Sequence, residues 1–325
     1  MIWVEFIISA AVIVLAATQL AKYGDIIAVR TRLGGMFIGI LLLAGATSLP
    51  EVLTTISSLS QGVPNLAAGN LLGSNMFNML LLAVIDLAGQ NQRILRKAEL
   101  KHALSGSLSV LLIAMVVFFI LAKIEFQIGW IGLDSIILML AYGVAIYLIQ
   151  ASSSSLVAVE YEIPAEYPSL RRGVIGFLVA AGVLAIVTPM MVRASAAIAE
   201  VTGLGTSFVG TTLVAVVTSL PELVTTLAAI KLGADDMAIG NLFGSNMFNM
   251  FALGLTDLFY LDGRFLSIID PAFLLVSILG LIMTIMALVG NLARIERRLW
   301  FLEIDALMLI LVYAGGLWLL YARGM

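Results

Sequence analysis

The sequence predicts an all-α polytopic membrane protein with about ten transmembrane helices, arranged as two inverted repeats of five. Of the 325 residues, 62% are hydrophobic and 11% are charged, and the mean hydropathy is +1.11. A chain this apolar has too little polar surface for a water-soluble globule. Apolar runs of roughly 20 residues, enough to cross a hydrocarbon core of about 30 Å, recur along the chain. Polar motifs in the first half of the chain also return, in the same order, in the second half.

The first five spans are expected to begin at the N-terminus, because its first apolar run lacks the basic flank and the cleavage site of a signal peptide. We place them near residues 3–23, 34–59, 64–88, 103–122 and 128–150. The other five are expected near 172–193, 205–230, 235–260, 271–290 and 299–320. A linker rich in Ser, Glu and Pro separates the two sets. The chain thus divides into a first half at 1–150, a cytoplasmic linker at 151–171 and a second half at 172–325.

The two halves carry the same motifs at a fixed offset. T-S-L-P-E at residues 47–51 returns unchanged at 218–222, and ten of the eleven residues of 69–79 match 240–250. This regularity indicates internal duplication. Because five crossings per repeat is an odd number, the second repeat must enter the membrane from the opposite side, as in many secondary transporters.

Lys and Arg residues predict the orientation, because cytoplasmic loops carry an excess of both. With the spans above, 13 of the 17 basic residues fall on one side and 4 on the other. We therefore expect an integral protein of the cell membrane with both termini outside and the linker inside.

Glu51 and Glu222 lie inside apolar spans, where no Lys or Arg offers a partner. A carboxylate in a membrane segment is costly, which marks a functional site and favours a mobile cation as the missing charge. One residue earlier, Pro50 and Pro221 lack the N–H that would bond the carbonyl four residues back. Broken helix at this depth is tolerated where it lines a cavity, and the freed carbonyls are oxygen ligands.

Further oxygen ligands surround the two glutamates. Thr47 and Ser48 precede Glu51 by four and three residues, so their hydroxyls can share its helix face. Two stripes at four-residue spacing form a second wall, namely Asn70, Ser74 and Asn78, and Asn241, Ser245 and Asn249. Calcium prefers about six to eight such oxygens, and both motifs lack the His and Cys that suit softer metals. The candidate metal ligands are Glu51, Glu222, Thr47, Thr218, Ser48, Ser219, Ser74, Ser245, Asn78 and Asn249.

Neighbouring residues have supporting roles. Gly69 and Gly73 should allow their helix to pack closely against the broken ones. Asn75 and Asn246 lie on another helix face and are expected to hydrogen-bond between helices. Asp257 is expected to be a solvated charge at a helix end, with a vestibule charge as the alternative, and Asp134 is expected to be interfacial.

The T-S-L-P-E and G-S-N-x-F-N motifs, their separation, their duplication and the ten spans resemble the two alpha-repeats of the sodium/calcium exchanger family, within the calcium/cation antiporter superfamily. The resemblance covers essentially the whole transport core. It implies that calcium and sodium share Glu51 and Glu222 and that Thr47 and Thr218 add oxygens beside the helix breaks. It further implies that sodium sites are lined by Ser48, Ser74, Ser219 and Ser245, and that the centre is completed by Asn78 and Asn249.

The same resemblance bears on the coupling ion. Several prokaryotic and potassium-dependent members have aspartate where Asn249 stands, whereas animal sodium/calcium exchangers have asparagine, and this difference argues against potassium dependence. Proton-coupled members typically carry a G-N-x-x-E segment in place of T-S-x-P-E, so sodium is favoured over protons.

Three other functions are less consistent with the sequence. A proton/cation exchanger would protonate the two glutamates, and a cation channel would conduct through the same oxygens without countertransport. An intramembrane hydrolase is disfavoured because H-E-x-x-H is absent and the chain has a single His. We therefore expect a transporter rather than an enzyme, without cofactor, nucleic acid or obligatory protein partner, whose partners are calcium, sodium and the bilayer.

Overall fold

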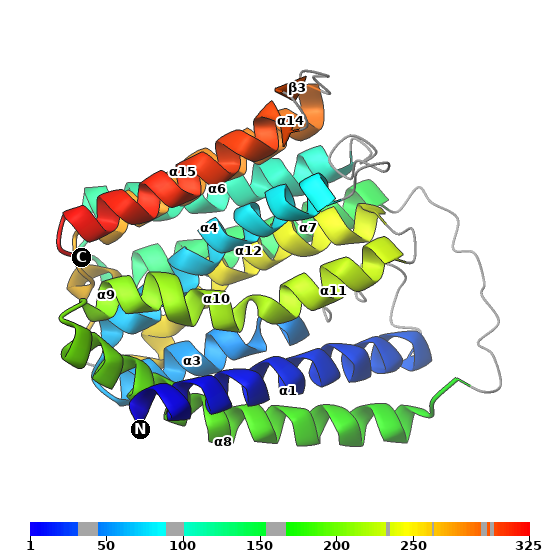
Figure 1. Cartoon of the computed structure of the whole chain (residues 1–325), viewed down its shortest axis with the longest axis horizontal. Helices are drawn as coiled ribbons and strands as arrows, with labels where there is room; N and C mark the ends of the chain where they lie inside the picture. Colours follow the sequence, from blue (N-terminus) through cyan, green and yellow to red (C-terminus); the bar gives the residue numbers. More distant parts are fainter. Residues whose placement is uncertain are drawn as a thin grey trace.

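The computed structural model describes residues 1–31, 45–88, 101–153, 167–231, 235–261, 263–293, 298–299 and 302–325. These residues form a bundle of helices with two short antiparallel hairpins (Figure 1). Eight helical segments among them are long and apolar enough to cross a membrane. The all-α polytopic fold expected from the sequence is confirmed, with the count of ten spans approximate.

The described residues of the first half form five helices and a hairpin. The helices are α1 (Ile2–Thr31), α3 (Leu49–Ser60), α4 (Pro64–Ala88), α6 (Lys101–Ala122) and α7 (Leu133–Ser153). The hairpin between α6 and α7 pairs β1 (Gln127–Ile128) with β2 (Ile131–Gly132). Residues 34–44 of the expected second span lie outside the described residues. So do residues 89–100, and residues 154–166 of the linker.

The second half begins with α8 (Leu170–Thr202), followed by a continuous run of short helices. The run comprises α9 (Thr206–Val209), the π-helix η1 (Gly210–Val214), α10 (Ala215–Thr218) and α11 (Leu220–Lys231). The remaining helices are α12 (Asp235–Phe259), α13 (Phe265–Ile268), α14 (Phe273–Ala293) and α15 (Ile304–Ala322). Between α14 and α15, β3 (Arg298–Leu299) pairs with β4 (Leu302–Glu303).

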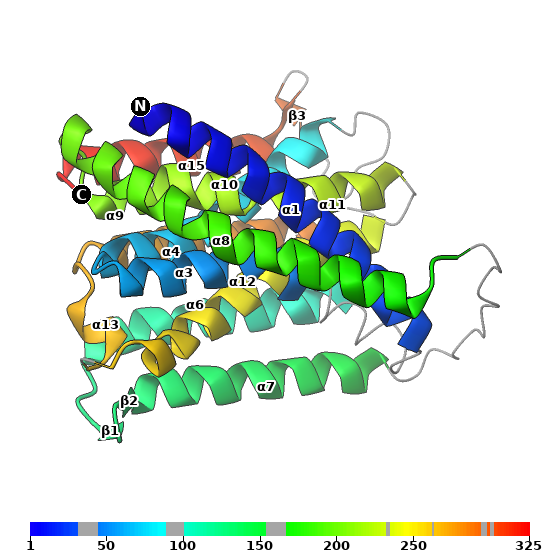
Figure 2. The ribbon, with the colours of Figure 1, turned by 90° about the horizontal axis from the view of Figure 1, so that it is seen from below.

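The duplication is visible in the element boundaries. Helices α3 and α11 are separated, at both ends, by the same offset as the sequence motifs, and so are α4 and α12. The two hairpins keep this offset as well. The equivalent helices α1 and α8 lie side by side and run in opposite directions (Figures 1 and 2). This antiparallel arrangement is what an inverted repeat requires.

Helix α8 is longer than expected, since it continues to Thr202, beyond the predicted end near residue 193. Its ends have clear causes. The Ser169 hydroxyl accepts a hydrogen bond from the backbone N–H of Arg172 at 3.3 Å, which caps the first turn. At the other end, Gly203 takes the left-handed conformation with φ of 72° that commonly terminates helices.

The centre of the bundle is formed by α4 and α12, surrounded by α3, α6, α7, α10, α11, α14 and α15. Of the eight potential spans, α4 is the most completely buried, whereas α7 and α8 are largely exposed. Large side chains such as Leu72, Met76 and Phe243 are 0–1% exposed and belong to the apolar core. Polar side chains on α3, α4, α11 and α12 are buried as well, and they include residues of the candidate site.

Candidate cation site

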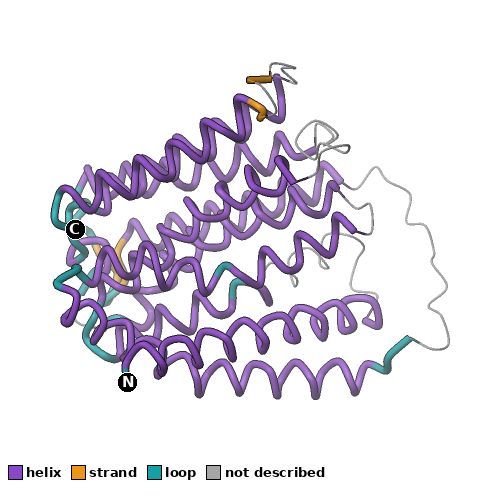
Figure 3. The backbone as a smooth tube through the Cα atoms, in the orientation of Figure 1, coloured by secondary structure: helices purple, strands orange, loops and turns teal. Residues whose placement is uncertain are grey.

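Both broken helices are interrupted at the serine of the T-S-L-P-E motif. Ser48 and Ser219 have nearly identical non-helical backbones, with φ and ψ of −90° and 7° and of −91° and 2°. The helix resumes at the next residue in each case, with proline in its first turn, where a missing N–H is tolerated. Figure 3 shows short interruptions of helix near the middle of the bundle.

The two breaks bring each glutamate to the serine of the opposite repeat. The Ser48 hydroxyl donates to Oε1 of Glu222 at 3.1 Å, and the Ser219 hydroxyl donates to Oε1 of Glu51 at 3.2 Å. All four side chains are 0–1% exposed. The sequence suggested that Ser48 would share a helix face with Glu51, but the turn at Ser48 redirects its hydroxyl across the repeat boundary.

The threonines and the first asparagine of each stripe hold the breaks in place. Asn70 donates through Nδ2 to the backbone carbonyl of Glu51 at 3.1 Å and accepts from the Thr218 hydroxyl at 2.9 Å. Asn241 makes the equivalent bond to the carbonyl of Glu222 at 3.5 Å. Thr47, the counterpart of Thr218, is fully buried. These bonds tie α4 and α12 to the segments that carry the carboxylates.

The serines of the two stripes are not used alike. Ser245 donates to Oε1 of Glu222 at 3.4 Å, whereas Ser74 donates to the carbonyl of Ala215 at 3.5 Å. Ala215 lies in α10, one turn before the break at Ser219. Both serine hydroxyls therefore reach the broken helix of the second repeat, although only Ser245 contacts a carboxylate.

Four buried oxygen atoms of the candidate ligands have no hydrogen-bond partner. They are Oε2 of Glu51, Oε2 of Glu222, Oδ1 of Asn78 and Oδ1 of Asn249. An unsatisfied buried acceptor is unusual in a protein and calls for an explanation such as a bound ion. The four atoms are two carboxylate and two amide oxygens, the hard donors that calcium and sodium take.

No basic side chain of the described residues forms an ion pair with either glutamate. The two buried carboxylates also repel one another. In a region of low dielectric constant, such a pair is expensive without a counter-charge. A cation between the two repeats would supply that charge.

Close helix packing positions the site. A Cβ atom added to Gly73 would lie 2.5 Å from the carbonyl oxygen of Thr211, and one added to Gly69 would lie 2.7 Å from the Thr211 nitrogen. Both glycines therefore allow α4 to touch the backbone of η1, as the sequence predicted. The π-helix was not predicted; π-helical turns often occur at functional sites.

Sequence reasoning gave a lesser role to Asn75 and Asn246, which turn out to bond directly to candidate ligands. Nδ2 of Asn249 donates to Oδ1 of Asn75 at 3.0 Å, and Nδ2 of Asn78 donates to Oδ1 of Asn246 at 2.9 Å. They do join two helices, as expected. Their repetition in both motifs was the available signal of a more specific role.

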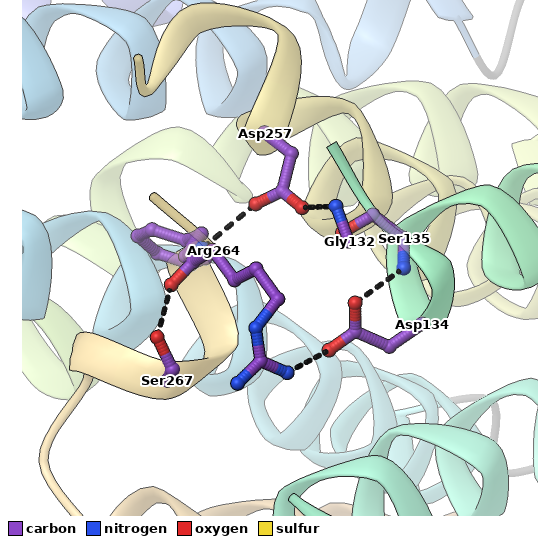
Figure 4. A network of polar contacts seen from close by, with 7 residues as sticks. Gly132, Asp134, Ser135, Asp257, Arg264 and Ser267 are labelled. Atoms are coloured by element: carbon purple, nitrogen blue, oxygen red, sulfur yellow. Dashed lines mark hydrogen bonds and ion pairs between the residues drawn. The ribbon is translucent and has the colours of Figure 1, made fainter. Parts of the chain in front are cut away.

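A separate polar cluster holds the ends of α12 and α7 together (Figure 4). Oδ2 of Asp257 accepts from the N–H of Gly132 at 2.8 Å, and Oδ1 accepts from the N–H of Phe265 at 2.7 Å. Asp134 lies 3.8 Å from Arg264. Both aspartates are at most 1% exposed, so the expectation of a solvated charge at Asp257 is wrong. The reason is that its carboxylate satisfies backbone donors of the adjoining loops.

The chain is similar to known exchangers in sequence and in fold. The chain is 54% identical over 63 residues to the sodium/calcium exchanger MaX1 of Methanosarcina acetivorans, which covers 19% of this chain and 18% of MaX1. The structure of the sodium-calcium exchanger NCX_Mj covers all of both chains at 20% identity with a TM-score of 0.60. A structure of the H+/Ca2+ exchanger CAX covers 99% of this chain and 88% of that one, at 14% identity and a TM-score of 0.67.

The two structural matches show a shared fold, and a family model adds the assignment. The model described as "Sodium/calcium exchanger protein" matches residues 1–150 and 172–322. The protein therefore belongs to the sodium/calcium exchanger family of membrane antiporters.

Proposed function

We propose that this protein exchanges calcium for sodium across the cell membrane by alternating access. The observation that carries the proposal is the set of four partnerless oxygens on Glu51, Glu222, Asn78 and Asn249, buried among residues of both repeats. Sequence identity to MaX1 over 63 residues supports sodium as the coupling ion. By the family resemblance, the T-S-L-P-E form of both motifs also favours sodium over protons.

Calcium binds between Glu51 and Glu222, whose two negative charges balance one divalent cation. Sodium ions bind the same carboxylates together with the hydroxyls and carbonyls beside them, so occupation by the two ions is mutually exclusive. The empty carrier leaves two ionised carboxylates in a region of low dielectric constant, which disfavours the reorientation of an unloaded site. This penalty couples the movement of one ion to that of the other.

Serine hydroxyls adapt the site to its charge. Ser48 and Ser219 each donate to a carboxylate oxygen of the opposite repeat. On ion binding, each hydroxyl can rotate and offer its lone pairs, since a hydroxyl is both donor and acceptor. These two serines, with Thr47, Thr218, Ser74 and Ser245, supply the remaining oxygens.

We further propose that both termini face the outside and that the linker at 151–171 faces the cytoplasm. The distribution of Lys and Arg supports this orientation. Both termini lie at the same end of the bundle (Figure 1), which agrees with an even number of crossings. The division into halves at 1–150 and 172–325 forms part of the same proposal.

Calcium-45 uptake into proteoliposomes loaded with sodium, potassium or choline at fixed pH tests the exchange. We expect uptake from sodium-loaded vesicles only, and its loss in Glu51→Gln and in Glu222→Gln. Glu125→Gln is a matched control because Glu125 is exposed and outside the site. Uptake that ignores sodium and follows an imposed pH gradient would identify a proton/calcium exchanger. Uptake without any counter-ion would identify a channel.

A further inference from the structure

We propose that Asn75 and Asn246 are positioning residues that hold the amide groups of Asn249 and Asn78 with their oxygens available to the cation. Each acts across the boundary between the repeats. The inference rests on the proposed calcium site and adds to it two residues that determine how that site presents its ligands.

The hydrogen bonds between these four residues run in one direction. Asn249 on α12 donates through Nδ2 to Oδ1 of Asn75 on α4 at 3.0 Å. Asn78 on α4 donates through Nδ2 to Oδ1 of Asn246 on α12 at 2.9 Å. In both pairs the candidate ligand is the donor. Its NH₂ group is therefore engaged, and its Oδ1 atom is left without a partner.

The environment of the two acceptors favours this direction. Nδ2 of Asn246 donates to the backbone carbonyl of Asn75 at 3.3 Å, which turns Oδ1 of Asn246 toward Asn78. Nδ2 of Asn75 faces Sδ of Met250 at 3.7 Å, which turns its Oδ1 toward Asn249. All four asparagines are 0–1% exposed, so water does not compete for these contacts.

The orientation of an amide matters at a cation site because its two ends have nearly the same shape and opposite polarity. Oδ1 attracts a cation, whereas the NH₂ group repels it. Asn78 and Asn249 each lie four residues after a serine of the polar stripes, and Ser245 contacts Glu222. A flip of either amide about its last side-chain bond would exchange the oxygen for N–H groups on this side of the helices. Asn75 and Asn246 remove that alternative by accepting from the NH₂ groups.

The two hydrogen bonds predict energetic coupling between a residue on α4 and a residue on α12 in each pair. Removal of Asn75 frees the amide of Asn249, and removal of Asn246 frees that of Asn78. We expect Asn75→Ala and Asn246→Ala each to weaken calcium binding by about tenfold, the low end of the loss seen when a group that orients a metal ligand is removed. The Asn75→Ala effect should disappear when Asn249 is already alanine, because no amide remains to be oriented.

Equilibrium binding of calcium-45 to the purified full-length protein measures these effects without dependence on the counter-ion. The cycles pair Asn75→Ala with Asn249→Ala, and Asn246→Ala with Asn78→Ala. The two pairs within one helix, Asn75 with Asn78 on α4 and Asn246 with Asn249 on α12, serve as comparison. Asn65→Ala is the matched control on α4, since its Oδ1 accepts from the N–H of Asp270 away from the site.

The inference is supported if the changes in binding free energy are strongly coupled within the two hydrogen-bonded pairs and nearly additive within the two same-helix pairs. Equal coupling in all four pairs, or full additivity throughout, would overturn it. If Asn75→Ala fails to fold, Asn75→Ser, which keeps an uncharged accepting oxygen, should bind calcium more tightly than Asn75→Val, which keeps none; equal binding by the two would overturn the inference. Unchanged binding in Asn75→Ala, alongside loss in Glu51→Gln, refutes the positioning role alone. Unchanged binding in Glu51→Gln refutes the proposed site itself.

Discussion

At the scale of single residues, each carboxylate is served by a hydroxyl from the other repeat. Ser48 reaches Glu222 and Ser219 reaches Glu51, so each half of the chain completes the site of the other. Sequence spacing could predict the serines as candidate ligands, because they lie beside the proline and the glutamate. It could not assign their partners, since that depends on the non-helical turn at each serine.

Substitution Ser219→Ala tests this exchange of partners. We expect a rise of about tenfold in the calcium concentration for half-maximal uptake, because the bound ion loses one of its oxygen ligands, and tenfold corresponds to about 1.4 kcal/mol. Ser152→Ala is the control, since Ser152 is exposed and its hydroxyl donates to the carbonyl of Ile149. Unaltered uptake in Ser219→Ala would show that this hydroxyl contributes nothing to binding.

At the scale of elements, Gly69 and Gly73 allow α4 to lie against the backbone of η1. Gly210 takes part from the other side, because a Cβ atom there would be 2.7 Å from the carbonyl oxygen of Leu66. The sequence could predict the close approach from glycines one turn apart. The π-helix could not be predicted, because the phase shift caused by one extra residue in a turn is not visible in the apolar pattern of this span.

Substitution Gly73→Ala is expected to destabilise the protein by about 1–3 kcal/mol, the usual cost of overpacking. The added methyl group would meet the carbonyl oxygen of Thr211 at 2.5 Å, and backbone cannot move aside as a flexible side chain can. Gly143→Ala in α7 is the matched control, because nothing lies within 4 Å of its Cβ position. Thermal unfolding of the purified protein should show a lower Tm for Gly73→Ala only; equal Tm values would contradict the packing account.

At the scale of the whole molecule, the inverted duplication brings equivalent oxygen atoms from both repeats to one candidate site. The fold class followed from composition, and the repeats followed from the fixed offset between the two copies of each motif. The end of α8 and the hydrogen bonds of the buried Asp257 carboxylate were not predicted. Hydropathy does not indicate where a helix stops or which polar side chain accepts hydrogen bonds from the backbone of a loop.

The absence of cysteine from the chain allows the proposed orientation to be tested with single cysteines. Glu125→Cys and Ser152→Cys place exposed thiols at opposite ends of the spans. A membrane-impermeant maleimide applied to intact cells should label Glu125→Cys and spare Ser152→Cys, while permeabilised cells should show both labelled. The reverse pattern in intact cells would invert the topology.

The central claim is that calcium and sodium compete for one site between Glu51 and Glu222. Equilibrium calcium-45 binding to the purified protein, measured against rising sodium with choline holding ionic strength constant, tests it most directly. We expect sodium to weaken calcium binding progressively, choline to have no effect, and Glu51→Gln and Glu222→Gln each to lose binding. Calcium binding that is insensitive to sodium, or that survives both substitutions, would contradict it.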